Sequence, residues 1–315
     1  MPFTEHVRPS RKAALLGCIF LGFSSGLPLF ILYNLLSAWL KSEGVDLKAI
    51  GLFALVGIPY TWKFIWAPAM DRFTLPILGR RRGWMIATQV LVMFAVMLMG
   101  QFNPSQEIWV VVGLAAVVAF FSASQDIVVD AHRREWLTEG QMGSGTALFV
   151  NAYKLSTLVP GSLSLILSDL ITWDWVFFIT GLFMLPGILT TLWVSEPNLY
   201  GPAPKTLKEA VVDPFKEFIG RRGIRHALLI LGFIFLYKLG DSMATALATP
   251  FYIELGFSRT EIGLVAKNAG LWASILGGIL GAYWMLKTGV NRALWLFGFL
   301  QALAILGFAI LAKTG

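Results

Sequence analysis

Residues 108–130 read Ile108-Trp-Val-Val-Val-Gly-Leu-Ala-Ala-Val-Val-Ala-Phe-Phe-Ser-Ala-Ser-Gln-Asp-Ile-Val-Val-Asp130. This stretch is long and apolar enough for a transmembrane helix, which needs about 20 predominantly apolar residues. Its two carboxylates, Asp126 and Asp130, are four residues apart and therefore share one helix face. A carboxylate in a membrane helix costs at least ~2.5–3.5 kcal/mol, so such a group is expected to face water or a partner charge and to have a function.

The composition of the whole chain is that of a polytopic membrane protein. Of 315 residues, 57% are hydrophobic and only 14% are charged, whereas soluble domains carry roughly 25% charged residues. One soluble core could not hide so much apolar surface, but a lipid bilayer can act as the solvent. Nine segments are long enough to span a bilayer. They are Ala13–Leu40, Ala49–Met70, Gly83–Gly100, Ile108–Asp130, Gly143–Leu167, Trp173–Val194, Ile224–Ile253, Glu261–Leu286 and Ala293–Ala312.

Positive charge is distributed unequally between the two sides of the predicted membrane. Of the 25 Lys and Arg residues, 17 lie in the N-terminal arm and the loops on its side, four lie on the opposite side and four within spans. Because cytoplasmic loops carry an excess of Lys and Arg, the N-terminus is predicted to be cytoplasmic. The net charge of +7 then reflects topology, and no nucleic-acid partner is expected.

An internal repeat predicts two halves. Gly44-Val-Asp-x-x-x-Ile-Gly-Leu52 matches Gly256-Phe-Ser-x-x-x-Ile-Gly-Leu264 at an offset of 212 residues, in equivalent loops. Two parallel halves joined by a cytoplasmic linker are the major facilitator arrangement. The predicted fold is thus an all-α polytopic membrane protein of the major facilitator type. Residues 1–194 would form a complete six-helix half, 195–223 a linker with an amphipathic helix, and 224–315 three helices of an incomplete second half. Such a truncated chain is not expected to transport alone.

The loop after the second span carries a cluster of charges. It reads Asp71-Arg-Phe-Thr-Leu-Pro-Ile-Leu-Gly-Arg-Arg-Arg-Gly83 and resembles the Asp-Arg…Gly-Arg-Arg signature of major facilitators, with a longer internal gap. In that family the signature forms a cytoplasmic charge clamp. Asp71, Arg72 and Arg80 are therefore predicted gate residues, and plain positive-inside charge is the alternative. Asp130 could join this gate by pairing with Arg134, four residues on.

Charged and aromatic residues inside the spans predict a transport cavity. Asp126, beside Gln125, lies ~10 Å inside the cytoplasmic end of its span and is a candidate for proton binding or the substrate path. A static pair with a lysine of a neighbouring helix is the alternative. Lys154 lies ~16 Å into the fifth span, and Lys63 lies in the second. Lys238 and Asp241, three residues apart, could neutralise each other. Lysines with aromatic neighbours, here Trp62 and Tyr153, suit an anionic solute that carries rings or sugars.

Motifs of enzymes and cofactor sites are absent from the sequence. It has no His-Glu-x-x-His, no Gly-x-Ser-x-Gly and no Walker loop. Cys18 is the single cysteine, so neither a disulfide framework nor paired metal ligation is expected. An intramembrane aspartyl protease built on Asp126 and Asp241 would lack the usual Gly-x-Gly-Asp context. We therefore expect no enzyme, no cofactor and no metal.

Several motifs together resemble the AmpG-type muropeptide permeases of the major facilitator superfamily. They are Gly22-Phe-Ser-Ser-Gly-Leu-Pro-Leu29, Val45-Asp-Leu-Lys-Ala-Ile-Gly-Leu-Phe53, Pro59-Tyr-Thr-Trp-Lys-Phe-Ile-Trp-Ala-Pro68, Ala123-Ser-Gln-Asp-Ile-Val-Val-Asp130, Tyr153-Lys-Leu155 and Tyr237-Lys-Leu-Gly-Asp241. The resemblance implies a proton-coupled, monomeric importer of GlcNAc-anhydroMurNAc peptides in the bacterial inner membrane, serving cell-wall recycling. The lysines would meet peptide carboxylates, the aromatic residues would stack on sugars, and Asp126, with Gln125 and Asp241, would couple protons.

Two other functions stay open at this point. The first is a carrier of another large organic anion, such as an acyl-CoA or a sugar phosphate. The second is a membrane sensor or partner-binding subunit that transports nothing. Uptake of labelled anhydromuropeptide, with and without a proton gradient, would separate these functions.

Overall fold

The computed structural model describes residues 10–46, 53–75, 78–197, 216–217, 219–220, 223–237 and 268–314. The elements in these ranges are helical, and the chain divides into two compact units, Met1–Ala210 and Val211–Gly315. By length and composition, six helices in the described part could cross a membrane. They are Arg11–Ser42, Arg80–Met99, Ile108–Trp136, Trp173–Trp193, Ala269–Thr288 and Val290–Gly307. The helical multi-pass class is confirmed, and the total of nine spans stays a prediction.

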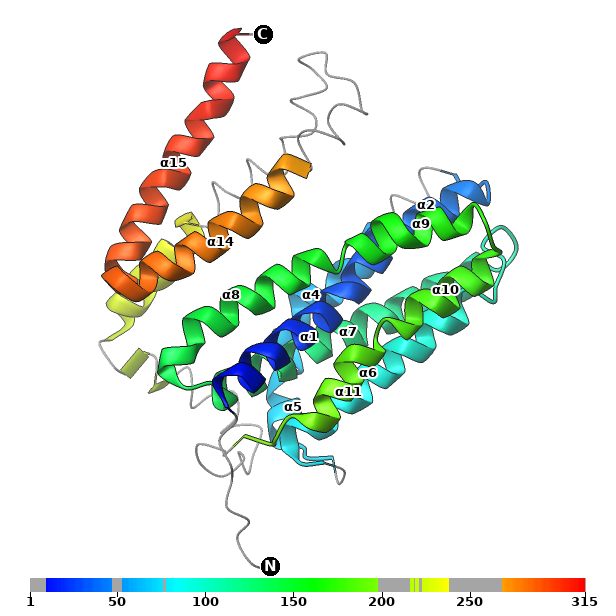
Figure 1. Ribbon diagram of the computed structural model, residues 1–315, viewed down its shortest axis with the longest axis horizontal. Helices are drawn as coiled ribbons and strands as arrows, with labels where there is room; N and C mark the ends of the chain where they lie inside the picture. Colours follow the sequence, from blue (N-terminus) through cyan, green and yellow to red (C-terminus); the bar gives the residue numbers. More distant parts are fainter. Residues whose placement is uncertain are drawn as a thin grey trace, which may run out of the picture. The chain divides into compact units, whose positions relative to one another are not determined.

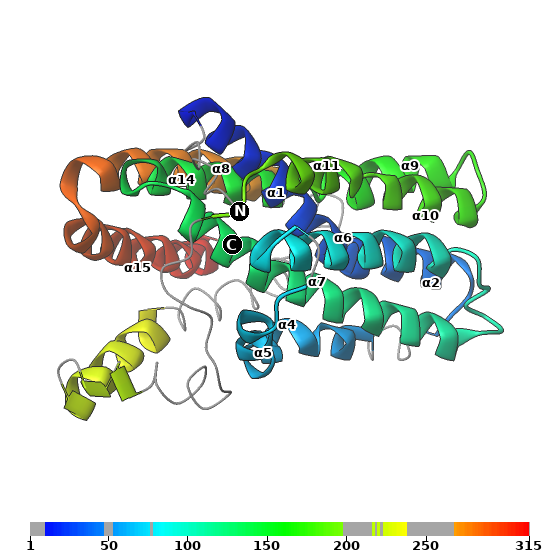
Figure 2. The ribbon, with the colours of Figure 1, turned by 90° about the horizontal axis from the view of Figure 1, so that it is seen from below.

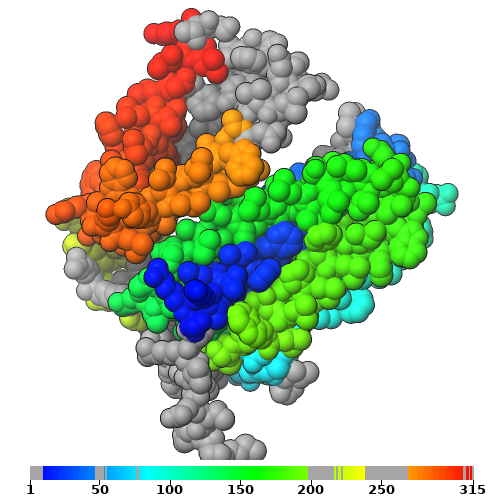
Figure 3. Space-filling view, in the orientation of Figure 1, coloured from blue at the N-terminus to red at the C-terminus, as the bar shows by residue number. Residues whose placement is uncertain are grey.

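In the first unit, α1 (Arg11–Phe30) lies at the centre of a helical bundle. It packs most extensively on α8 (Glu139–Leu155) and also contacts α7 (Ile108–Trp136) and α11 (Leu185–Trp193). The space-filling view shows α1 exposed as a strip between α8 and α11 (Figure 3). On the other side of the bundle, α6 (Arg80–Met99) lies along α7 (Figures 1 and 2).

Two glycines allow the close contact between α1 and α8. A Cβ atom added at Gly22 would lie 2.3 Å from the carbonyl oxygen of Phe149, and one added at Gly26 would lie 2.4 Å from that of Tyr153. The four-residue spacing places both glycines on one face of α1, which is the small-residue packing that brings membrane helices together. Any side chain at either position would push the two helices apart.

The second apolar segment is broken into short helices. Over the described residues 53–72 it forms η2 (Phe53–Gly57), α4 (Ile58–Trp62), η3 (Lys63–Ile65) and α5 (Ala67–Arg72). Pro59 and Pro68 stand in the first turns of α4 and α5, where a missing N–H is tolerated, but a proline cannot continue the helix that precedes it. The structure therefore differs from the continuous helix expected over Ala49–Met70.

Proline also shapes the first and fifth segments. Pro28 lies inside α1 and is followed by a π-helical turn, η1 (Ile31–Leu35), yet the chain stays helical through α2 (Leu36–Ser42). After α8, Pro160 opens a second π-helical turn, η4 (Val159–Leu163), which leads into α9 (Ser164–Ser168). The fifth segment is thus two helices joined by an irregular turn, where one helix was expected.

The remaining helices are close to the expected spans. α10 (Trp173–Leu182) continues into α11, and α7 runs on to Trp136, six residues beyond its expected end. The second unit contains a helix over Gly223–Tyr237, α14 (Asn268–Thr288) and α15 (Val290–Thr314). Most of the expected amphipathic linker helix, and most of the internal repeat, lie outside the described residues.

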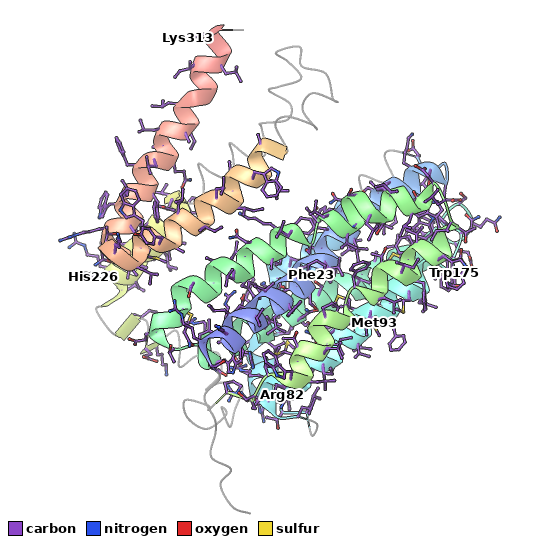
Figure 4. The ribbon with its side chains drawn as sticks, in the orientation of Figure 1. Phe23, Arg82, Met93, Trp175, His226 and Lys313 are labelled. Carbon is purple, nitrogen blue, oxygen red and sulfur yellow. The ribbon has the colours of Figure 1, made fainter. Side chains whose placement is uncertain are left out.

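The core of the first unit consists of two apolar clusters. One is centred on Trp39, Met99 and Phe177, and the other on Cys18, Met85 and Val129. Arg82 and Trp175 lie at opposite ends of the unit (Figure 4). An excess of arginine at one end and tryptophan at the ends are features of a bundle that spans a bilayer.

Candidate functional site

Buried polar side chains form a layer between the two apolar clusters of the first unit. On each of four helices they occupy the turns that separate residues of one cluster from residues of the other. They are Ser24 and Ser25 on α1, Thr88 and Gln89 on α6, Ser122, Ser124 and Gln125 on α7, and Thr190 and Thr191 on α11. We call this set the polar layer.

Hydrogen bonds within the polar layer tie the helices together. The Gln125 amide donates to Ser24 Oγ at 3.1 Å, which joins α7 to α1. Thr191 Oγ1 donates to Gln89 Oε1 at 2.9 Å, which joins α11 to α6. Bonds of this kind stabilise membrane helix contacts by roughly 0.6 kcal/mol on average. Gln125, a predicted site residue, is therefore a fully buried link between helices, one residue before Asp126.

Asp126 lies at the edge of this layer and has two partners. Ser25 Oγ on α1 donates a hydrogen bond to Asp126 Oδ1. Lys63 Nζ lies 3.4 Å from Asp126 Oδ2, with 13% of the Asp126 side chain and 35% of the Lys63 side chain exposed. Because α7 ends at Trp136, Asp126 is ten residues, or ~15 Å, from the helix end. It therefore lies deeper in its helix than the sequence-based estimate suggested.

Lys63 reaches Asp126 because the broken second segment packs along α7. Lys63 begins the short helix η3, directly after α4. Three residues later, the Trp66 indole N–H donates to Ser124 Oγ at 3.0 Å, and its ring packs on Phe120 with centroids 4.9 Å apart. Both contacts are to the part of α7 that directly precedes Asp126, and they hold the segment against the helix there. Lys63 was expected to meet substrate. In the structure it is also the lysine of a neighbouring segment that was considered as a partner for Asp126.

Asp130 has a different partner from the one expected. Its carboxylate lies 2.9 Å from Arg133 Nη2, three residues on, instead of pairing with Arg134. The Arg133 guanidinium also stacks over the Phe149 ring at 4.2 Å, which holds it on the inner side of the helix. The Asp130 side chain is 50% exposed and the Arg133 side chain 14% exposed, so the carboxylate of this pair is half in contact with the surroundings.

The charge cluster predicted for the loop after the second span is centred on Arg81. The Arg81 side chain is 5% exposed and makes an ion pair with Asp71. It also makes a two-pronged contact with Glu135, with nitrogen–oxygen distances of 2.6 and 3.0 Å. We call these three residues the Arg81 cluster. Of the three consecutive arginines, Arg81 is the one that meets Asp71, whereas the predicted gate residues included Arg80 and not Arg81. Arg72 instead lies over the Phe73 ring at 5.3 Å.

The residues expected to bind substrate are only partly brought together. Tyr153 lies edge-on to Phe30, with ring centroids 5.9 Å apart, and Lys154 is the next residue of α8. Trp62 is 52% exposed and stacks on Phe64. Lys238 and Asp241 lie outside the described residues.

Sequence reasoning missed Ser25, Arg81 and Glu135. A pair of serines in an otherwise apolar span was a usable signal for Ser25. Nothing in a run of three arginines distinguishes the middle one, because only the direction of the first turn of α6 decides which of them points inward. In the described ranges, no group of three His, Cys, Asp or Glu residues could hold a metal ion.

Comparisons with known proteins place the chain in a family. Residues 18–315 match the family model of the Major Facilitator Superfamily. A Haemophilus influenzae protein whose name assigns no function is 44% identical over 303 residues, covering 96% of this chain and 71% of that protein.

Two named relatives are also similar. The anhydromuropeptide permease of Escherichia coli is 44% identical over 306 residues, and the match covers 96% of this chain and 61% of the permease. A Rickettsia felis protein that carries the name AmpG 4 is 33% identical over 298 residues, covering 91% of this chain and 71% of that protein. The chain thus spans about three-fifths of the length of the Escherichia coli permease. It belongs to the major facilitator superfamily and, within it, to the AmpG family of permeases.

Proposed function

We propose that this chain forms part of a proton-coupled importer of anhydromuropeptides in the bacterial inner membrane. The observation that carries the proposal is the 44% identity to the Escherichia coli anhydromuropeptide permease along 96% of the chain. Asp126 supports the proton coupling, because it is a mostly buried carboxylate in a spanning helix with a lysine and a serine as partners. Groups of this kind mark proton and substrate pathways in transporters.

Lys63 gives the proposal a mechanism. While Asp126 is ionised, it attracts the Lys63 ammonium, which lies 3.4 Å away. When Asp126 takes up a proton, that attraction is lost and Lys63 becomes free to bind a carboxylate of the muropeptide peptide. Proton and substrate would thus be loaded together, because each favours the arrangement that the other needs. Lys154, Lys238, Trp62 and Tyr153 remain proposed substrate contacts, and Gln125 and Asp241 remain proposed coupling residues.

Alternating access is the proposed transport cycle, and the Arg81 cluster is its proposed cytoplasmic gate. Arg81 joins the ends of α5, α6 and α7 through Asp71 and Glu135. Opening the cytoplasmic side would require some of these contacts to break. Arg72, Arg80, Asp130 and Arg134 lie on the same side and remain proposed secondary members of the gate.

The proposed architecture follows from the same family. Residues 1–194 would form a six-helix half, 195–223 a cytoplasmic linker, and 224–315 helices of the second half. These residues would contain nine spans. The protein is proposed to act as a monomer with its N-terminus in the cytoplasm. The boundary between the two compact units, at Ala210, falls inside the proposed linker.

Uptake into membrane vesicles tests the proposal. Vesicles from a strain that lacks its own permease, supplied with the full-length protein, should accumulate labelled GlcNAc-anhydroMurNAc peptide only when a proton gradient is present. Uptake that is unaffected by an uncoupler would contradict proton coupling. Uptake of an acyl-CoA or a sugar phosphate in place of the muropeptide would assign a different substrate, and vesicles that take up none of these would favour a sensor.

A further inference from the structure

The N-terminus of α6 forms a cradle for an anion, next to the Arg81 cluster. Gly79 precedes the helix with φ of 97°, a conformation that favours glycine. The backbone N–H groups of Arg81 and Arg82 lie in the first turn of α6, where no carbonyl of the helix can accept from them. Amides in this position, together with the helix dipole, attract negative charge.

Glu196 fills this cradle. Its Oε1 accepts a hydrogen bond from the Arg81 N–H at 2.7 Å, and its Oε2 accepts one from the Arg82 N–H at 3.0 Å. A Cβ atom at Gly79 would lie 2.8 Å from the Glu196 carboxyl carbon. Two separate features therefore require glycine at position 79. One is the positive φ, and the other is the space that the Glu196 carboxylate occupies.

The chain around Glu196 is held in place by other residues of the same end. His132 Nε2–H donates to the Ser195 carbonyl at 3.1 Å, and the Trp136 indole N–H donates to Ser195 Oγ at 3.2 Å. The Arg82 side chain donates to the carbonyls of Thr191 and Leu192 at 2.9 and 2.7 Å, at the end of α11. The segment that follows α11 is thus fastened to both α6 and α7.

Arg81 connects Glu196 to the proposed gate. Arg81 gives its backbone N–H to Glu196 and its guanidinium to Asp71 and Glu135. A carboxylate that fixes the backbone of Arg81 also fixes the direction in which the Arg81 side chain leaves the helix. Arg80 and Arg82 lie about 100° away from Arg81 around the helix axis. The winding of this first turn therefore decides which of the three arginines points toward Asp71 and Glu135.

We propose that Glu196 is a positioning residue for the cytoplasmic gate, which selects Arg81 as the gate arginine by holding the first turn of α6. The inference rests on the proposed function of the Arg81 cluster as a gate. It adds a residue from the proposed linker, so that the chain leaving the first half and the gate form one hydrogen-bonded unit.

Hydrogen exchange tests the positioning directly. Glu196→Ala removes the acceptor of two amides, and charge-assisted hydrogen bonds contribute about 1.5 kcal/mol or more. Amides at the start of α6 should therefore exchange at least about tenfold faster in the full-length protein. Glu139→Ala, which removes an exposed carboxylate from the first turn of α8, is the matched control. Equal exchange at α6 in both variants would overturn the proposal.

A second pair of variants guards against a general folding defect. Gly79→Ala keeps the carboxylate but fills the cradle, and it should speed exchange of the same α6 amides. Gly140→Ala is its control, because nothing lies within 4 Å of a Cβ there. If Gly79→Ala leaves the α6 amides as slow as Gly140→Ala does, the cradle has no role.

Uptake measurements then ask whether Glu196 acts through the Arg81 cluster. In that case Glu196→Ala and Asp71→Asn both disrupt the Arg81 cluster. Uptake by the double variant should then be hardly slower than uptake by Asp71→Asn alone. Losses that multiply in the double variant would contradict action through the Arg81 cluster. If the unaltered protein takes up no anhydromuropeptide, the proposed function fails, and the exchange measurements still decide whether Glu196 holds α6.

Discussion

Asp126 and Asp130 are one helical turn apart on α7, but their surroundings differ. Asp126 is 13% exposed and is held by Lys63 and Ser25 from two other segments. Asp130 is half exposed and is paired with Arg133 of its own helix. A carboxylate with partners on neighbouring helices can transmit a change of its charge to those helices. At the residue scale, this difference makes Asp126 the better candidate for the coupling carboxylate.

Removal of the Ser25 hydroxyl should impair coupling. A hydrogen bond to a charged group contributes about 1.5–3 kcal/mol, so we expect Ser25→Ala to slow proton-driven uptake by roughly tenfold. Ser42→Ala is a matched control, because that hydroxyl donates to the Trp39 carbonyl at the C-terminal end of the same span, away from Asp126. Initial uptake rates at equal protein levels measure the effect. A Ser25→Ala protein that transports as fast as Ser42→Ala would argue against this role.

At this scale the sequence indicated which polar side chains lie inside apolar helices, but it did not indicate their partners. Charged and amide residues in apolar runs identified Asp126, Gln125 and Lys63. Their pairing depended on how α7 packs against the segment that carries Lys63, and sequence spacing does not contain that information. Asp130 illustrates the same limit, because positions three and four residues away are both within reach on a helix. The structure selects Arg133.

At the scale of elements, the contact between α1 and α8 depends on two glycines. Gly22→Ala places a methyl group against the Phe149 carbonyl oxygen, and overpacking typically destabilises a protein by about 1–3 kcal/mol. For a unit of this size, each kcal/mol lowers the unfolding midpoint by about 2–4 °C. Thermal unfolding of the purified protein in detergent measures the shift. Gly113→Ala, where a Cβ would meet nothing within 4 Å, should leave the midpoint unchanged.

The sequence predicted uninterrupted spans well and broken ones poorly. The apolar runs that became α6 and α7 had boundaries close to the observed ones at their starts, because nothing inside them interrupts a helix. The second and fifth spans contain Pro59, Pro68 and Pro160, but prolines are often tolerated in membrane helices. Whether such a proline bends a helix or ends it depends on which neighbours satisfy the freed backbone groups. That requires the packed structure.

At the scale of the whole molecule, the distribution of positive charge predicts orientation. A cysteine placed at Gln106, an exposed position between α6 and α7, should be labelled in intact cells by a thiol reagent that cannot cross the inner membrane. A cysteine at Glu139, at the start of α8, should be labelled only after the membrane is opened. The native Cys18 is buried, so we expect it to add little background labelling by the thiol reagent. The reverse pattern of labelling would place the N-terminus outside.

The function as a whole rests on the family and on one carboxylate. Similarity to the Escherichia coli permease supports the substrate class, and the position of Asp126 supports the coupling ion. These two claims can fail separately. A protein could carry muropeptides without using Asp126 for protons, and net uptake alone would not distinguish a lost proton site from a lost substrate site.

The most direct test compares net uptake with exchange in Asp126→Asn. Exchange of labelled for unlabelled anhydromuropeptide across the membrane needs substrate binding and movement but no net proton transfer. The account predicts that Asp126→Asn, at normal membrane levels, loses uphill accumulation driven by a proton gradient and keeps exchange near the unaltered rate. Accumulation that remains normal in Asp126→Asn and still collapses with an uncoupler would show that another group carries the proton.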